Sequence, residues 1–366
     1  MSVHLQAKNN LFTRPLLKWY RAHGRDLPWR RTSDPYAVWV SEIMLQQTQV
    51  ATVLPYYDRF LTLFPTLRAL AASPPDKVLK AWEGLGYYAR ARHLQRAAKE
   101  IVARHGGTFP ESFEEILSLP GIGRSTAGAI ATIALGQRHP ILDGNVKRVL
   151  CRYFCIEEDP KKKEVEEALW RYSEALLPQK GADHYTQAIM DLGATVCTPT
   201  APRCPICPVK DSCGAFEKGL QDRLPVRSRP KLIPHRDYIA GVVTRGDRVL
   251  IRKRPAKGLL GGMWEFPGGE ITGEQIDRGA KAVLRQEIPW RVSTWTPLAK
   301  IRHTFTHFKM TLHVFSGAVT GKGGKEEGDL KWVLLDRLSE YPFSSAQQKI
   351  LLLLTKKEAD QPRLFS

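Results

Sequence analysis

A glycine-containing turn between two helical segments decides how this chain is interpreted: Leu119-Pro120-Gly121-Ile122-Gly123. Its glycines, Gly121 and Gly123, permit tight backbone conformations that other residues avoid. The bare N–H groups at the start of the next segment, residues 124–136, can then approach a phosphate closely and hold a nucleic acid without reading its sequence. Such a turn taken alone is usually only a turn, so its meaning depends on the rest of the chain.

The segments around this turn predict an all-α domain. Asp34 and Pro35 begin one helix, as an N-cap followed by proline in the first turn, and a helical period of apolar residues continues from there. Short connections with glycine and proline separate further expected helices at residues 76–82, 90–104, 111–119, 124–136, 145–155 and 161–176. Consecutive helices, rather than alternating strands and helices, are typical of an all-α fold.

The pattern changes after residue 215. Residues 218–236 are basic, contain proline and show little apolar periodicity, which predicts a linker. The expected elements beyond it are short strands at residues 238–243, 248–253, 311–315 and 332–335, and helices at residues 277–287 and 345–355. We therefore expect a helical domain over residues 1–217, the linker over 218–236, and an α+β domain over 237–366.

Composition and charge limit the class of protein. The chain has 366 residues, and its 55 Lys+Arg against 37 Asp+Glu give a net charge of +18. The values of 43% apolar and 25% charged residues exclude a disordered, collagenous or coiled-coil chain. No apolar run approaches the roughly 20 residues that span a bilayer, and no secretory signal is present, so we expect a cytoplasmic protein without a membrane.

The distribution of charge favours an anionic partner. Residues 1–150 carry a net +9, residues 151–200 a net −3, and residues 201–366 a net +12. Two folded basic units on one chain favour nucleic acid as the partner. On charge alone, a merely basic soluble protein is an equally good explanation.

Four of the six cysteines lie in one run: Cys197, Cys204, Cys207 and Cys213. Because a cytosolic chain keeps its thiols reduced, this run predicts metal ligands rather than disulfides. One compact loop with unequal spacing suits a cubane iron–sulfur cluster, whereas zinc ribbons typically use two Cys-x2-Cys pairs set well apart. The spacing alone leaves zinc open as an alternative.

The turn and a following aspartate resemble a known superfamily. Asp143 comes twenty residues after Gly123, and a helix–hairpin–helix followed at that distance by an aspartate resembles the helix–hairpin–helix DNA glycosylases. Further motifs extend the resemblance over nearly the whole chain, to the endonuclease III-like MutY family of bacterial adenine DNA glycosylases. They are Trp39-Val40-Ser41-Glu42-Ile43-Met44-Leu45-Gln46-Gln47-Thr48, Gly84-Leu85-Gly86-Tyr87-Tyr88, Leu142-Asp143-Gly144-Asn145-Val146 and the cysteine run.

The resemblance implies an activity and a cofactor. The family excises adenine mispaired with 8-oxoguanine or guanine by hydrolysing its N-glycosidic bond, in base excision repair. It carries a 4Fe-4S cluster on four cysteines, here Cys197, Cys204, Cys207 and Cys213. We accordingly expect double-stranded DNA with A:8-oxoguanine or A:G mispairs as the partner of a nucleoid-associated monomer.

Two carboxylates are the expected catalytic residues. Glu42 shares a helical face with Val38, Trp39 and Leu45, and a carboxyl among apolar neighbours has a raised pKa and can act as a general acid. Because the adenine anion is a poor leaving group, the base needs such a proton, and the resemblance implies delivery to N7. Asp143 begins a helix, whose N-terminus is expected to keep it ionised beside a developing oxocarbenium at C1′. A solvated surface glutamate and a simple N-cap are the ordinary alternatives.

Ser125 distinguishes between related activities. Endonuclease III-like relatives have a lysine after Gly-x-Gly-Arg, and its amine attacks C1′. A hydroxyl stands at this position here, which predicts a monofunctional glycosylase that uses water and does not cut the strand efficiently. A pyrimidine glycosylase/lyase is the rival enzyme, and a catalytically inactive DNA-binding protein with a zinc loop is the rival of another class.

Other residues match family positions that contact the base or the DNA. Adenine must leave the duplex before Glu42 can reach it. The resemblance implies an adenine pocket of Arg25, Trp29, Arg30 and Gln187, stack-filling residues Gln47 and Tyr87, and DNA contacts at Gly121, Gly123 and Ser125. Without the family match, a polar residue at a helix end and a core aromatic explain Gln47 and Tyr87 equally well.

The stretch from Gly261 to Glu270 resembles the start of a Nudix fold. The hydrolase pattern would continue from Gly268, and Glu274 fits it. Ala282-Val283 stands where an Arg-Glu pair would be, and Gln286 replaces one closing glutamate. Because too few carboxylates remain to bind magnesium, we expect this domain to bind without hydrolysing.

A short loop in this domain matches the family's reader of 8-oxoguanine. Its residues are Phe305, Thr306 and His307, and threonine stands where the family has serine. Thr306 keeps the hydroxyl, so a hydrogen bond to the oxidised base is still expected. The alternative is an ordinary strand with alternating aromatic residues.

Overall fold

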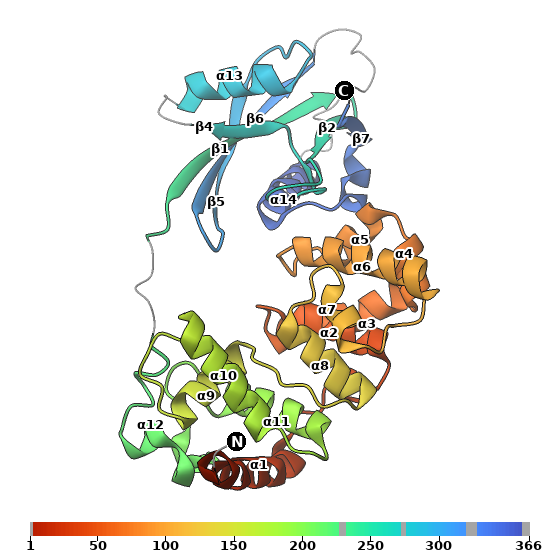
Figure 1. Cartoon of the computed structure of the whole chain (residues 1–366). Helices are drawn as coiled ribbons and strands as arrows, with labels where there is room; N and C mark the ends of the chain where they lie inside the picture. Colours follow the sequence, from red (N-terminus) through yellow and green to blue (C-terminus); the bar gives the residue numbers. More distant parts are fainter. Residues whose placement is uncertain (1–2, 227–231, 272–275, 320–327, 361–366) are drawn as a thin grey trace. The chain divides into compact units, whose positions relative to one another are not determined.

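The computed structural model describes residues 3–226, 232–271, 276–319 and 328–360 (Figure 1). The chain forms two compact units. The first comprises Met1–Ala71 and Arg96–Pro230, and the second comprises Ala72–Gln95 and Lys231–Ser366. No helix of the described residues is long and apolar enough to cross a membrane.

The first unit is all helical, as expected. Its α-helices are α1 (Val3–His23), α2 (Pro35–Leu45), α3 (Val50–Leu63), α4 (Leu67–Ala72), α7 (Phe113–Ser118), α8 (Arg124–Leu135), α9 (Gly144–Tyr153), α10 (Lys163–Leu176), α11 (Ala182–Thr195) and α12 (Gly214–Glu217), with short 3-10 helices at Pro28–Arg30, Cys204–Ile206 and Lys210–Ser212. Helix α5 (Pro75–Ala81) lies in the second unit, and α6 (Ala89–His105) runs from the second unit into the first.

Local sequence signals explain where the helices near the turn begin and end. Asp34 accepts a hydrogen bond from the Tyr36 N–H at 3.1 Å, and Pro35 follows as the first residue of α2. Gly121 adopts a φ of +81° in the turn, and α8 begins directly after Gly123. Helix α8 ends at Gly136, whose φ of +66° is a left-handed conformation that favours glycine.

Close backbone packing fixes the segment that leads to Asp143. A Cβ atom at Gly128 would lie 2.5 Å from the Pro140 carbonyl oxygen, so Pro140 passes α8 at a distance that only glycine permits. A Cβ at Gly193 of α11 would lie 2.7 Å from that of Asn145. Helices α1, α9, α10 and α11 share one apolar core around these contacts.

The second unit contains a mixed sheet, which confirms the α+β expectation. Its strands are β1 (His235–Arg245), β2 (Arg248–Lys253), β3 (Trp264–Glu265), β4 (Gly268–Ile271), β5 (Thr296–Thr304), β6 (Lys309–Ala318) and β7 (Leu330–Leu334). The order is β3-β2-β1-β6-β5, with β4 paired to β1 and β7 paired to β2. Only the pairing of β1 with β6 is parallel among these described strands.

Two helices cover the sheet (Figure 1). Helix α13 (Ile276–Glu287) packs on Ile239 and Val243 of β1, and α14 (Ser345–Asp360) belongs to the core of Ala240 and Val242. These residues alternate along β1, so the two helices lie on opposite faces. Strand β1 begins at His235, inside the stretch expected as linker, and residues 227–231 of that stretch lie outside the described residues.

Candidate active site

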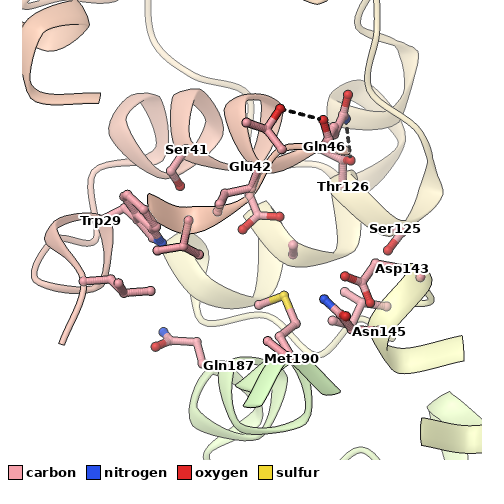
Figure 2. Close-up of a pocket in the computed structure, with 18 of the residues that line it drawn as sticks. Trp29, Ser41, Glu42, Gln46, Ser125, Thr126, Asp143, Asn145, Gln187 and Met190 are labelled. Atoms are coloured by element: carbon pink, nitrogen blue, oxygen red, sulfur yellow. Dashed lines mark hydrogen bonds between the residues drawn. The ribbon is translucent and has the colours of Figure 1, made fainter. Parts of the chain in front are cut away.

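A cavity of about 910 Å³ lies in the first unit, between α2, α8, α11 and the start of α9 (Figure 2). Eight residues selected from the sequence line it, although they come from distant parts of the chain. They are Arg25, Trp29, Arg30, Glu42, Gln47, Ser125, Asp143 and Gln187. The expected catalytic pair and the expected adenine pocket thus share one cavity.

Glu42 is the expected general acid of this cavity. It extends from α2 into the space opposite Asp143 (Figure 2), and no hydrogen bond to its carboxyl is found among the described residues. Burial, and to a lesser extent the negative charge of Asp143, raise the pKa of Glu42 to about 7 against the opposing effect of Arg30. Near neutral pH a large fraction of Glu42 is therefore protonated, as a general acid requires.

Asp143 is the better stabilised anion of the pair. It caps α9 and accepts a hydrogen bond from the Val146 N–H at 2.7 Å. Burial nevertheless raises the pKa of Asp143, against the effect of the Val146 and Asn145 N–H groups. This direction is opposite to the one expected from the helix N-terminus alone, because the sequence did not reveal how deeply the carboxyl is buried. Since Glu42 receives no comparable donors, a proton shared by the pair belongs on Glu42.

Ser125 has a structural partner that the sequence did not suggest. Its Oγ accepts a hydrogen bond from the Leu142 N–H at 3.0 Å, one residue before Asp143. The Ser125 hydroxyl therefore holds the segment that carries Asp143. Nearby, Gln46 donates to the Thr126 hydroxyl at 3.2 Å and connects the end of α2 to α8 (Figure 2).

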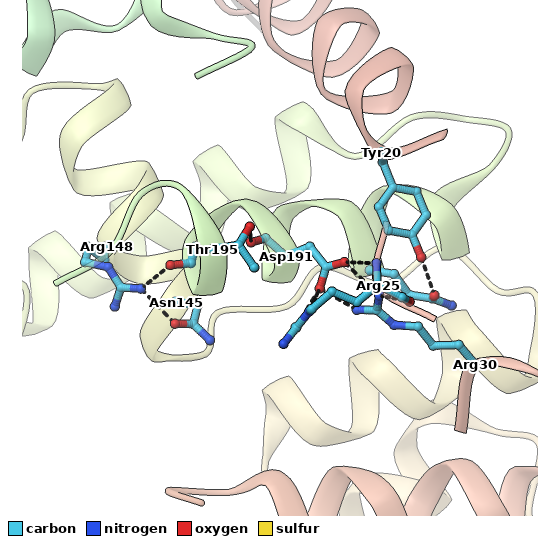
Figure 3. A network of polar contacts seen from close by, with 9 residues as sticks. Tyr20, Arg25, Arg30, Asn145, Arg148, Asp191 and Thr195 are labelled. Carbon is cyan, nitrogen blue, oxygen red and sulfur yellow. Dashed lines mark hydrogen bonds and ion pairs between the residues drawn. The ribbon is translucent and has the colours of Figure 1, made fainter. Parts of the chain in front are cut away.

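Asp191 is the site residue that sequence reasoning missed (Figure 3). It is fully buried on α11 and forms ion pairs with Arg25 at 2.6 Å and with Arg30 at 2.7 Å. Burial raises the pKa of Asp191, but hydrogen bonds and charge from Arg30 and Arg25 outweigh this and hold it below its usual range. Asp191 thus anchors both arginines expected in the adenine pocket. Its only signal in the sequence is an acidic residue in an otherwise apolar stretch of α11.

The two residues expected to fill the DNA stack have unusual backbones. Gln47 adopts a φ of +56° in the first unit, and Tyr87 a φ of +48° in the second. Both side chains are exposed, Tyr87 by 44%, so neither is a core residue. Left-handed backbone at residues other than glycine is uncommon and concentrates at functional sites.

The four cysteines of the run line one small cavity beside α9, together with apolar side chains. Arg152 donates to the Cys197 sulfur at 3.2 Å. No group of three or more His, Cys, Asp or Glu in the described part of the chain is arranged to hold a single metal ion. Four sulfurs around one apolar cavity nevertheless fit a multi-atom cubane cluster, whose ligands stand further apart than those of one ion.

Comparison with known proteins identifies the family. A model of the HhH-GPD superfamily of base excision DNA repair proteins matches residues 40–175, and a NUDIX domain model matches residues 239–353. The chain is 36% identical to the adenine DNA glycosylase of Rattus norvegicus, over 93% of this chain and 77% of that protein. It is also 36% identical to that of Buchnera aphidicola subsp. Acyrthosiphon pisum, over 83% of this chain and 85% of that one. The chain belongs to the adenine DNA glycosylase family.

Membership in the adenine DNA glycosylase family makes the chain a hydrolase of N-glycosyl bonds in DNA repair, as the resemblance implied. Solved structures agree with the helical fold. A thermostable thymine-DNA glycosylase matches with a TM-score of 0.53 at 30% identity, over 58% of this chain and 98% of that one. A trapped endonuclease III–DNA intermediate matches with a TM-score of 0.52 at 20% identity, over 59% of this chain and 98% of that chain.

The second unit of this adenine glycosylase places the expected 8-oxoguanine loop at a hairpin. Phe305, Thr306 and His307 lie in the turn between β5 and β6, where the Phe305 N–H donates to the Phe308 carbonyl at 2.9 Å. Thr306 and His307 are exposed. The Tyr87 and Thr306 hydroxyls of this unit are 2.9 Å apart. Residues 305–307 therefore form a turn with exposed polar side chains, not a regular strand.

Two glutamates of the Nudix-like fold form ion pairs with arginine. Glu265 is buried and pairs with Arg252 and Arg254, each at 2.6 Å. Arg252 also pairs with Glu287, the glutamate kept at the end of the pattern. Glu274 lies outside the described residues. The Arg252 guanidinium therefore lies between the carboxylates of Glu265 and Glu287, and binding without hydrolysis stays a prediction.

Proposed function

We propose that this adenine glycosylase removes adenine mispaired with 8-oxoguanine or guanine from double-stranded DNA, as a monofunctional enzyme. The observation that carries the proposal is the pairing of Glu42 and Asp143 across one cavity, with Ser125 at the position of the lyase lysine. No lysine is among the described residues that line this cavity, so no amine is available there to attack C1′.

The two carboxylates divide the chemistry. Glu42 gives its proton to adenine N7 as the N-glycosidic bond breaks, so that neutral adenine leaves. Asp143 is the anion that stabilises positive charge developing at C1′. Water then adds to C1′ and gives up a proton to the carboxylate that Glu42 has become, which leaves an abasic site and restores the acid. The pairing of one protonated and one ionised carboxyl follows the pattern of glycosidases.

We assign each remaining residue to the part of the DNA that it contacts. Arg25, Trp29, Arg30 and Gln187 contact the extruded adenine, and Gln47 and Tyr87 fill the stack. The turn at Gly121 and Gly123, with Ser125, lies against the DNA backbone. Phe305, Thr306 and His307 read 8-oxoguanine, and the exposure of Thr306 and His307 at a hairpin turn supports this role.

We also propose a 4Fe-4S cluster on Cys197, Cys204, Cys207 and Cys213. Its contribution is to fold the loop next to α9, since none of the four cysteines lines the cavity of Glu42. Visible charge-transfer absorption together with four irons per chain would support the assignment. A colourless protein with bound zinc would contradict it.

The remaining proposals concern the whole chain. We infer a cytoplasmic, nucleoid-associated enzyme that acts as a monomer, with a helical domain over residues 1–217, a linker over 218–236 and a Nudix-like domain over 237–366. The basic charge of both folded parts supports binding to DNA.

The test is a strand-scission assay on duplexes with A:8-oxoguanine, A:G and A:T. We expect adenine release from the first two, with strand breaks that appear only after alkali opens the abasic site. Breaks without alkali would contradict the monofunctional assignment. Release only opposite thymine would contradict the mispair specificity.

A further inference from the structure

Gln187 has a partner on the side away from the cavity. The Tyr20 hydroxyl of α1 lies 2.7 Å from Gln187 Oε1 on α11 (Figure 3). Gln187 lines the cavity, whereas Tyr20 is not among the lining residues. Tyr20 therefore contacts the expected adenine pocket from behind, through one side chain.

The phenol is the donor in this hydrogen bond. Burial raises the pKa of Tyr20 above its ordinary value, so the hydroxyl keeps its proton at neutral pH. Gln187 Oε1 is the acceptor found for that proton among the described residues. An amide with its oxygen held toward Tyr20 must turn its nitrogen the other way.

The Gln187 Nε2 has no hydrogen-bond acceptor among the described residues. Gln187 is only 9% exposed, and the described residues provide no acceptor for its Nε2. Asp191, one turn further along α11, is engaged by Arg25 and Arg30 instead. Gln187 Nε2 is not among the fully buried atoms without a partner, so it is reached from the cavity and can donate to an acceptor on the molecule that fills it.

We propose that Tyr20 is a positioning residue that fixes the orientation of the Gln187 amide, so that Nε2 donates to a nitrogen of the six-membered ring of the extruded adenine. The inference rests on the proposed placement of Gln187 in the adenine pocket. N7 belongs to the five-membered ring and takes the proton of Glu42, which leaves N1 and N3 as the acceptors. The hydroxyl thus acts through Gln187 and touches no substrate.

A double-mutant cycle tests this role. Single-turnover adenine release is measured for wild type, Tyr20→Phe, Gln187→Ala and the double variant, on A:G as well as A:8-oxoguanine duplexes. Tyr20→Phe should slow release about fivefold, the effect of one hydrogen bond. In the Gln187→Ala background it should cause no further loss. Tyr36→Phe is the matched control, because it removes a buried hydroxyl that donates to the Phe64 carbonyl at 2.8 Å outside the cavity.

The outcomes separate the claims. A Gln187→Ala variant that is slow and is slowed further by Tyr20→Phe overturns the role of Tyr20 alone. A Gln187→Ala variant as fast as wild type contradicts the adenine-pocket placement, and this inference with it. Duplexes with 1-deazaadenine and 3-deazaadenine identify the acceptor, since the Tyr20→Phe penalty should vanish on one of them. A full penalty on both overturns the proposed contact.

Discussion

At the scale of single residues, the site depends on unequal surroundings for two like carboxyls. Asp143 has N–H donors from the start of α9, whereas Glu42 has apolar neighbours and the charge of Asp143. The sequence indicated both residues, because the apolar helical face around Glu42 and the helix start at Asp143 are visible in it. It did not indicate Asp191, since a single aspartate in a helix shows neither its burial nor its partners.

Glu42 should weaken the fold when it ionises. Burial raises its pKa to about 7, above the value in the unfolded chain, so its contribution to stability is complete at low pH and is lost as the pH rises through about 7. We expect Glu42→Gln to be more stable than wild type by about 3 kcal/mol near pH 8 and no more stable near pH 4. Urea unfolding at both pH values measures this. The same stability difference between Glu42→Gln and wild type at both pH values would contradict this prediction. So would an equal gain in stability from Glu158→Gln, which changes an exposed glutamate.

Ser125→Lys should add lyase chemistry. The substitution removes the hydrogen bond to the Leu142 N–H and brings an amine to the cavity wall. We expect borohydride to trap a covalent complex with DNA that wild type and Ser125→Ala do not form. Absence of the adduct, in a variant that still binds the duplex, would show that the missing lysine does not explain monofunctional behaviour.

At the scale of elements, about half of the helices of the first unit could be predicted from their ends, whereas α3, α4, α11 and α12 were not expected. Asp34-Pro35, Gly123 and Gly136 mark starts and stops, and α5 to α10 lie within a few residues of expectation. Helix α1 was not predicted, and its internal Pro15 explains why. Strand β5 was also missed, because it carries Pro297 and has weak alternation of burial. Packing against the rest of the unit stabilises such elements, and local patterns do not show packing.

The close approach of the Pro140 segment to α8 should be intolerant of a methyl group. Gly128→Ala places a Cβ 2.5 Å from the Pro140 carbonyl oxygen, and we expect a loss of about 1–3 kcal/mol in stability and slower adenine release, because the same segment carries Asp143. Thermal unfolding measures the loss. Gly144→Ala is the control, since its Cβ would meet open space. Equal stability of the two variants would contradict the close packing.

At the scale of the whole molecule, the proposed adenine site and the proposed lesion-reading hairpin lie on different units of one chain. The cavity of Glu42 belongs to the first unit and the hairpin of Thr306 to the second. Both parts carry net positive charge, so we expect both to contribute to the salt dependence of DNA binding. Charge predicted the type of partner. Charge could not predict which proposed role belongs to which unit, because that assignment depends on motifs at either end of the chain.

The hydroxyl of Thr306 should set the preference for the oxidised base. Thr306→Ala should reduce the ratio of A:8-oxoguanine to A:G rates about fivefold, because one hydrogen bond to the lesion is lost. Thr306→Ser should keep the ratio, since the hydroxyl remains. Single-turnover rates on both duplexes measure it. An unchanged ratio in Thr306→Ala would remove this residue from lesion reading.

The central claim is that protonated Glu42 drives release of adenine mispaired with 8-oxoguanine. The most direct measurement is the single-turnover rate on A:8-oxoguanine duplexes as a function of pH, for wild type and Glu42→Gln. The rate of wild type should fall as the pH rises above about 7, where the acid loses its proton, and Glu42→Gln should be inactive throughout. Release by Glu42→Gln at the wild-type rate, or no release by wild type at any pH, would contradict the account.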